Sequence, residues 1–87
     1  MAINMTHPAN YYASTVAIPD YVESAIAALP RHRLLDLSHD LIESIRDRQW
    51  SSRENNPTLT GKPDEWLDNQ GVETFKSLLR WISMELI

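Results

Sequence analysis

The segment Leu34–Ile45, LLDLSHDLIESI, decides the fold of this chain. If the segment is helical, with about 100° between successive side chains, its apolar residues fall in one wide sector, the pattern of a helix that packs against a core. The sector comprises Leu34, Leu35, Leu37, Leu41, Ile42 and Ile45. We therefore predict a core-facing helix from about Pro30 to Trp50, with the proline in the first helical position that it favours.

The same segment holds Ser38, His39 and Asp40 side by side, the three residue types of a hydrolytic triad. Consecutive side chains on a helix point about 100° apart, so they cannot hydrogen-bond in series as nucleophile, base and orienting acid. On the predicted helix Ser38 falls among the leucines, whereas His39 and Asp40 are expected to face solvent. The three residues therefore do not predict a catalytic triad.

A shorter helix is predicted immediately before this one, from Asp20 to Leu29. Asp20 is a favourable helix-capping residue, and the apolar residues that follow it recur at helical spacing. These residues are Val22, Ala25, Ile26 and Leu29. Pro30 ends the helix, because proline lacks an amide hydrogen and disfavours helical geometry in the residue before it.

Residues 1–19 contain no formally charged side chain and are predicted to form an extended N-terminal arm ahead of a helical domain at residues 20–87. The stretch Tyr11–Ile18, YYASTVAI, is rich in β-branched and aromatic residues, as strands are. A lone strand needs a pairing partner, so we expect an extended segment laid over the helices, unless a second chain supplies the neighbouring strand. Such an arm can also become ordered on contact with a partner.

The C-terminal half begins with a loop and ends with a second amphipathic helix. The segment Ser51–Lys62, SSRENNPTLTGK, is rich in turn-forming residues and long for a connection, a feature of functional loops. Helix is predicted from Pro63, and Gly71 either ends a short helix or lies inside a longer one. A stripe of apolar residues follows: Val72, Phe75, Leu78, Leu79, Ile82 and Leu86. The predicted fold is all-α, a small bundle of three to four helices with an extended N-terminal arm.

Composition narrows the functional classes. The chain has 87 residues, the size of one domain, and no cysteine, which excludes disulfides, thiolate zinc sites and cysteine nucleophiles. A cysteine-free chain fits the cytoplasm. The first residues lack the features of a secretory signal, and no window approaches the roughly 18 apolar residues of a membrane span. The two glycines stand apart, so no phosphate-binding loop and no cofactor are predicted.

One line of potential metal ligands lies on the Pro30–Trp50 helix. His32, Asp36, His39 and Glu43 are four, three and four residues apart, which aligns them along one side of the helix. This side lies opposite the leucine sector, where ligands lack supporting contacts. A solvated, ion-paired stripe is therefore expected, with no metal and no enzymatic activity. A metal-dependent enzyme that uses these residues is one alternative.

A cluster of arginines next to a tryptophan is a candidate for binding nucleic acid or another anion. It comprises Arg31, Arg33, Arg46, Arg48 and Trp50. Arginine pairs well with phosphate, and tryptophan stacks on bases. Acidic residues interleave with these arginines, however, and the chain carries a net charge of −4, which argues against a general binder of polyanions. A nucleic-acid-associated protein, or an acidic mimic of nucleic acid, is the second alternative.

The main functional prediction comes from the last helix. Trp81 and Met84 lie off its apolar stripe, and Trp66 joins them if the helix continues through Gly71. Aromatic residues and methionine on an otherwise solvated side are typical of protein interfaces, although the arm or a neighbouring helix could cover them instead. The predicted partner-binding residues are Trp66, Trp81, Met84, Tyr11 and Tyr12, with the Ser51–Lys62 loop as a secondary candidate.

From these residues we predict a small, non-enzymatic protein-binding regulator, adaptor or inhibitor. Such proteins, including those of bacterial mobile elements, are often this short and free of cysteine. The predicted partner is another protein, and a second copy of the same chain is an alternative. This inference rests on the short length of the chain and its lack of cysteine, not on a specific motif.

Overall fold

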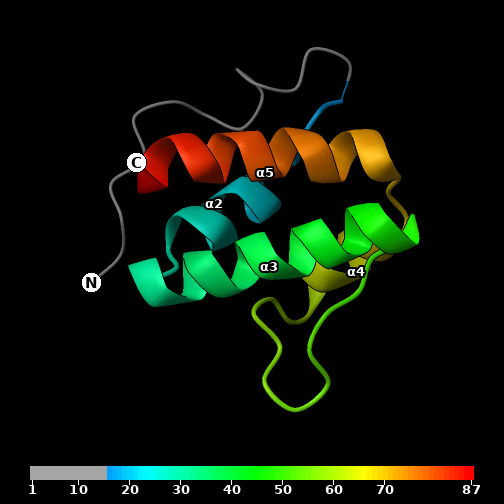
Figure 1. The fold of residues 1–87 in the computed structure, drawn as a ribbon, viewed down its shortest axis with the longest axis horizontal. Helices are drawn as coiled ribbons and strands as arrows, with labels where there is room; N and C mark the ends of the chain where they lie inside the picture. The colour runs from blue at the N-terminus through cyan, green and yellow to red at the C-terminus, as the bar shows by residue number, and fades with distance from the viewer. Residues whose placement is uncertain (1–15) are drawn as a thin grey trace.

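The computed structural model describes residues 16–87 and contains four helices in this part of the chain. They are α2 (Asp20–Ala27), α3 (Arg31–Asp47), α4 (Lys62–Asp68) and α5 (Val72–Leu86). No strand occurs within these residues, so the prediction of an all-α bundle is confirmed (Figure 1). Most of the predicted N-terminal arm, residues 1–15, lies outside the described residues.

Local sequence explains where the first two helices begin and end. Helix α2 starts directly after the extended Pro19 and has Asp20 and Glu23 in its first turn, where the helix dipole favours acids. Pro30 directly precedes α3 with an extended backbone, ψ of 164°, so it is not the first helical residue that the sequence predicted. Helix α3 ends at Asp47 because Arg48 adopts the left-handed conformation, with φ of 60°. The prediction that this helix extends to Trp50 was therefore too long.

Helices α3 and α5 lie side by side and run antiparallel (Figure 1). At one end of this pair, Nη2 of Arg31 donates a hydrogen bond of 3.0 Å to the carbonyl oxygen of Leu86. This places the beginning of α3 beside the end of α5. Helices α2 and α4 contact each other, and they lie behind the α3–α5 pair in the view of Figure 1. The loop between α3 and α4 extends from the side of α3 that is remote from α5.

Gly71 separates α4 from α5. Its backbone is extended, with φ of −111° and ψ of −174°, so the two helices do not join into one. Of the two possibilities that the sequence left open, the structure has the short helix that ends before Gly71. Trp66 and Trp81 therefore belong to different helices.

The core contains side chains from every helix and from the segments between them. Its buried apolar members are Ile18, Val22, Ile26, Leu34, Leu37, Leu41, Trp50, Leu59, Leu67, Phe75, Leu78, Trp81 and Ile82. Ile18 precedes α2, so the last part of the predicted arm packs in the core. Leu35 and Ile42, in contrast, are 51% and 54% exposed. The predicted core-facing sector of α3 was thus too wide, because only the part that carries Leu34, Leu37 and Leu41 is completely buried.

Within residues 16–87, no helix is both long enough and apolar enough to cross a membrane.

Candidate functional site

Trp81, predicted to lie on an exposed surface, is a core residue. Only 1% of its surface is exposed, and it is the largest of the fully buried side chains in the described residues. Thr74 and Ser77, which precede it by seven and four residues on the same side of α5, are buried as well. Helix α5 is therefore covered well beyond its apolar stripe, and the prediction of an exposed Trp81 was wrong.

The other predicted contact residues have different surroundings. Trp66 is partly buried and packs against the core from α4. Met84 is 55% exposed on α5, as predicted. Tyr11 and Tyr12 lie outside the described residues. The structure therefore keeps Met84 as an exposed apolar residue, whereas Trp81 belongs to the core and Trp66 packs against it.

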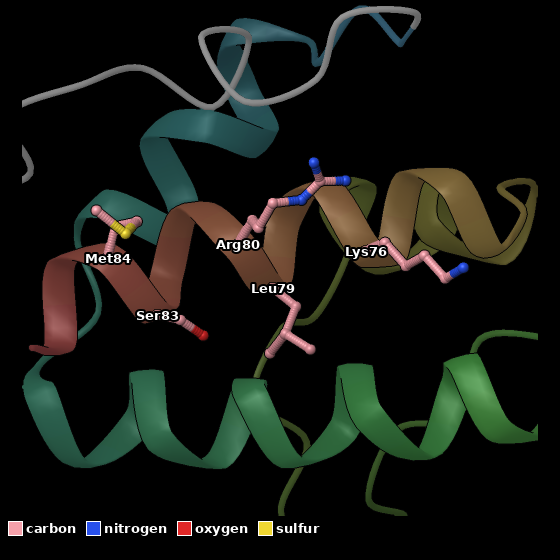
Figure 2. A pocket seen from close by; sticks show the side chains of 5 residues that line it. All are labelled: Lys76, Leu79, Arg80, Ser83 and Met84. Atoms are coloured by element: carbon pink, nitrogen blue, oxygen red, sulfur yellow. The ribbon is translucent and has the colours of Figure 1, made fainter.

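The outer faces of α3 and α5 carry exposed or partly exposed apolar side chains, with Met84 on the edge of α5 that points away from α3 (Figure 2). We call these two faces the α3–α5 surface; its apolar members are Leu35, Ile42, Leu79 and Met84. Leu35 and Ile42 are seven residues apart, so they lie two turns apart on the same edge of α3. Asp36 and Asp40 occupy the edge that faces the loop, which leaves Leu35 and Ile42 on the edge nearer to α5. The loop therefore does not cover them.

Leu79 links the two halves of this surface. Figure 2 shows its side chain directed from α5 towards α3, and it is partly buried against the core. Leu79 also lines an open hollow of about 380 Å³ along the outer side of α5, together with Lys76, Arg80, Ser83 and Met84. Two of these five lining residues are cations and none is an acid. The α3–α5 surface is thus apolar and bordered by positive charge on α5.

Two members of the predicted arginine patch are engaged in structural contacts. Nη2 of Arg33 donates a hydrogen bond of 2.6 Å to the carbonyl oxygen of Pro57, and its Nη1 lies 3.1 Å from Oδ2 of Asp36. Arg33 therefore holds the loop against α3. Arg31 binds the last turn of α5 through the carbonyl of Leu86. Both arginines stabilise the fold through these contacts. A nucleic acid could bind the two guanidinium groups only by replacing the carbonyl and carboxylate oxygens that they contact now.

The remaining members of the patch do not form a stacking site. Trp50 is buried, its Nε1 donates a hydrogen bond of 2.6 Å to Oδ1 of Asp64, and its ring lies 6.1 Å from that of Phe75 between centroids. Arg46 pairs with Glu43 and Asp47. Arg48 is exposed beyond the end of α3. The structure thus separates these residues instead of gathering them on one face.

The line of potential metal ligands is also divided. Nε2 of His39 lies 3.9 Å from Oε1 of Glu43, whereas Asp36 pairs with Arg33 and Arg53 on the loop side. In the part of the chain that the structure describes, no three His, Cys, Asp or Glu side chains are grouped so that they could hold a metal ion. His32, Asp36, His39 and Glu43 therefore do not converge.

Asp40 was predicted to face solvent but is 3% exposed. Its Oδ2 accepts a hydrogen bond of 3.0 Å from Oγ1 of Thr58, and its Oδ1 lies 3.6 Å from Nε of Arg53. Burial raises the pKa of the Asp40 carboxyl, and the hydrogen bond from Thr58 and the charge of Arg53 partly offset this rise. The contacts tie the loop to α3, so this buried acid has a structural explanation.

The loop predicted as a secondary contact site is held at several points. The backbone N–H of Ser51 donates a hydrogen bond of 2.8 Å to Oγ of Ser44 at the end of α3. Thr58 and Leu59 are buried further along the loop. Its length is therefore explained by packing along α3. One signal in the sequence could have indicated this: Asp40 lies three residues after Leu37 and one before Leu41, at the margin of the core-facing sector.

Comparison of the chain with models of protein families, with curated protein sequences and with solved structures gave no match.

Proposed function

We propose that this protein works without catalysis, by binding another protein through the α3–α5 surface. The observation that carries the proposal is the exposure of Leu35, Ile42 and Met84, each more than half exposed, around the partly buried Leu79. Single exposed apolar side chains are common on monomeric proteins, but several of them on two helices that pack against each other are typical of a contact surface. A regulator, adaptor or inhibitor of another protein would use such a surface.

The position of this surface supports the proposal. Helices α3 and α5 are the two longest helices in the described residues, and they pack against each other along their length. Side chains on the outer faces of these two helices are therefore held on a rigid base, which lowers the entropy lost on binding. Methionine at the edge of such a surface adapts to a partner's shape.

The contacts of the arginines favour protein binding over the two alternatives. Arg33, Arg46 and Arg53 are paired with acids, and Trp50 is buried, which leaves little for phosphates or bases to contact. Asp40, the acid with a raised pKa, is engaged by Thr58 and Arg53, which is a structural role. For the location we propose the cytoplasm, on the grounds of the cysteine-free composition alone.

A capture experiment with matched variants tests the proposal. The immobilised protein is exposed to an extract of its native host in three forms: wild type, Leu35→Ser with Ile42→Ser, and Tyr21→Ser. Tyr21 is a suitable control because it is exposed to 46%, is aromatic and lies on α2. We expect the wild type and the Tyr21 variant to retain the same proteins, and the double variant to lose them. Equal capture by all three forms would refute the proposal.

A further inference from the structure

We infer that the partner segment on the α3–α5 surface is an acidic amphipathic helix, an inference that rests on the proposed function. Its apolar side chains contact Leu79, Met84 and the exposed leucine and isoleucine of α3, while its carboxylates contact Lys76 and Arg80. Helix-in-groove recognition of this kind is a recurrent mode of peptide binding. The inference adds the chemistry of the partner to the proposal that a partner exists.

The first argument is charge. Lys76 and Arg80 are exposed and line the same hollow as Leu79 and Met84 (Figure 2). Neither side chain forms an ion pair or a hydrogen bond within residues 16–87. Arg33 and Arg53, in contrast, are paired with acids on the loop side of α3. In a chain with a net charge of −4, the apolar hollow is therefore bordered by cations that are free to meet anionic groups.

The second argument is spacing. Lys76 and Arg80 are four residues apart on α5, which puts them about 6 Å apart along the helix axis and makes them repel each other. Two carboxylates four residues apart on a partner helix have the same spacing and would relieve that repulsion. Glu73, the acid one turn before Lys76, is not among the residues that line the hollow.

The third argument concerns the lining of the hollow. Leu79 and Met84 make most of it apolar, and Ser83 is its one uncharged polar residue. A nucleic acid needs a row of cations that follows its phosphates. Each basic residue near an anionic membrane contributes only about 1 kcal/mol to the binding free energy, so two such residues bind a membrane weakly. Two cations beside an apolar surface suit a peptide that has both apolar and acidic side chains.

A pair of designed peptides tests this inference. Each has about 18 residues, or five helical turns, with leucines along one side; one peptide carries glutamates beside the leucines and the other carries lysines at the same positions. Binding is measured by fluorescence anisotropy at about 0.05 M and about 0.5 M salt. We expect the glutamate peptide to bind at least about threefold more tightly than the lysine peptide, and to weaken with salt, because exposed charge pairs contribute a few tenths to 1 kcal/mol each.

Charge reversal supplies the matched control. Lys76→Glu with Arg80→Glu should reverse the preference between the two peptides. Lys62→Glu with Arg48→Glu changes the net charge equally at exposed positions outside the surface, and should leave the preference unchanged. Equal binding of both peptides, binding of neither, or a preference that persists in the Lys76/Arg80 variant would overturn the inference. So would binding to vesicles of anionic phospholipid in place of the glutamate peptide.

The Lys76/Arg80 charge reversal also distinguishes a failure of this inference from a failure of the proposed function. In the capture experiment, the Lys76/Arg80 variant should lose the proteins that the wild type retains. If that variant retains them while the Leu35/Ile42 variant does not, the surface binds a protein but the partner is not acidic. If neither variant changes the capture, both the inference and the proposed function fail.

Discussion

Thr58 donates a hydrogen bond of 3.0 Å from Oγ1 to Oδ2 of Asp40, an acid that is buried on α3. The two residues lie 18 positions apart, and their contact fixes the middle of the α3–α4 loop to the helix. Arg53 approaches the same carboxylate and also pairs with Asp36. This network occupies one edge of α3 and leaves the opposite edge, with Leu35 and Ile42, uncovered.

Thr58→Val should destabilise the protein by about 1–3 kcal/mol, because the substitution keeps the shape of the side chain but removes a hydrogen bond to a buried acid. Urea unfolding followed by circular dichroism measures the change. Thr60→Val, at an exposed position of the same loop, is the control and should change stability by less than about 0.5 kcal/mol. Equal effects of the two substitutions would contradict the structural role of Thr58.

The raised pKa of Asp40 gives a pH dependence with a definite sign. The folded protein holds the Asp40 proton more tightly than the unfolded chain, whose aspartates have a pKa of about 3.9, so stability falls as pH rises from about 4 through the folded pKa. Asp40→Asn removes this titration. The stability of the variant relative to the wild type should therefore increase between about pH 4 and pH 7. Urea unfolding at several pH values tests this, and a constant difference would show that the pKa is not raised.

Trp81→Ala should cost about 3–5 kcal/mol, the usual effect of removing a buried aromatic side chain, and could unfold so small a domain. Met84→Ala, three residues further along the same helix but exposed, should cost less than about 0.5 kcal/mol. Thermal unfolding of the two variants checks the contrast. Similar melting temperatures would contradict the burial of Trp81.

A second contrast lies on α3. Leu37→Ala should cost about 2–5 kcal/mol because the side chain is completely buried, whereas Leu35→Ala, two residues away, should have little effect on stability. The measurement is the free energy of unfolding in urea. Comparable losses from both leucines would mean that the apolar sector of α3 faces the core over its full width.

The sequence predicts features that depend on neighbouring residues in one helix better than features that depend on contacts between distant segments. The helical periodicity of Leu34, Leu37 and Leu41 correctly predicted α3, because it reflects the helix itself. The exposure of Leu35 and Ile42 was missed, since the width of a buried sector depends on how much of the helix its neighbours cover. Within the described residues, the helices are present where they were predicted, with ends displaced by a few residues.

Trp81 and Asp40 were missed for the same physical reason. Trp81 is buried although it lies beside the apolar stripe of α5, because other parts of the fold cover that side of the helix. Asp40 is buried because its polar partners, Thr58 and Arg53, come from a loop 13 to 18 residues further along the chain. Neither environment is visible in the local sequence pattern.

The central claim is that the α3–α5 surface is where this protein contacts its partner, and site-specific photo-crosslinking in cells tests it most directly. A photoreactive amino acid replaces Ile42 in one form of the protein and Tyr21 in another, because both side chains are exposed and they lie on different helices. We expect a discrete crosslinked product between this protein and a different protein from position 42 and none from position 21. Crosslinking from position 21 with none from position 42 would contradict the claim.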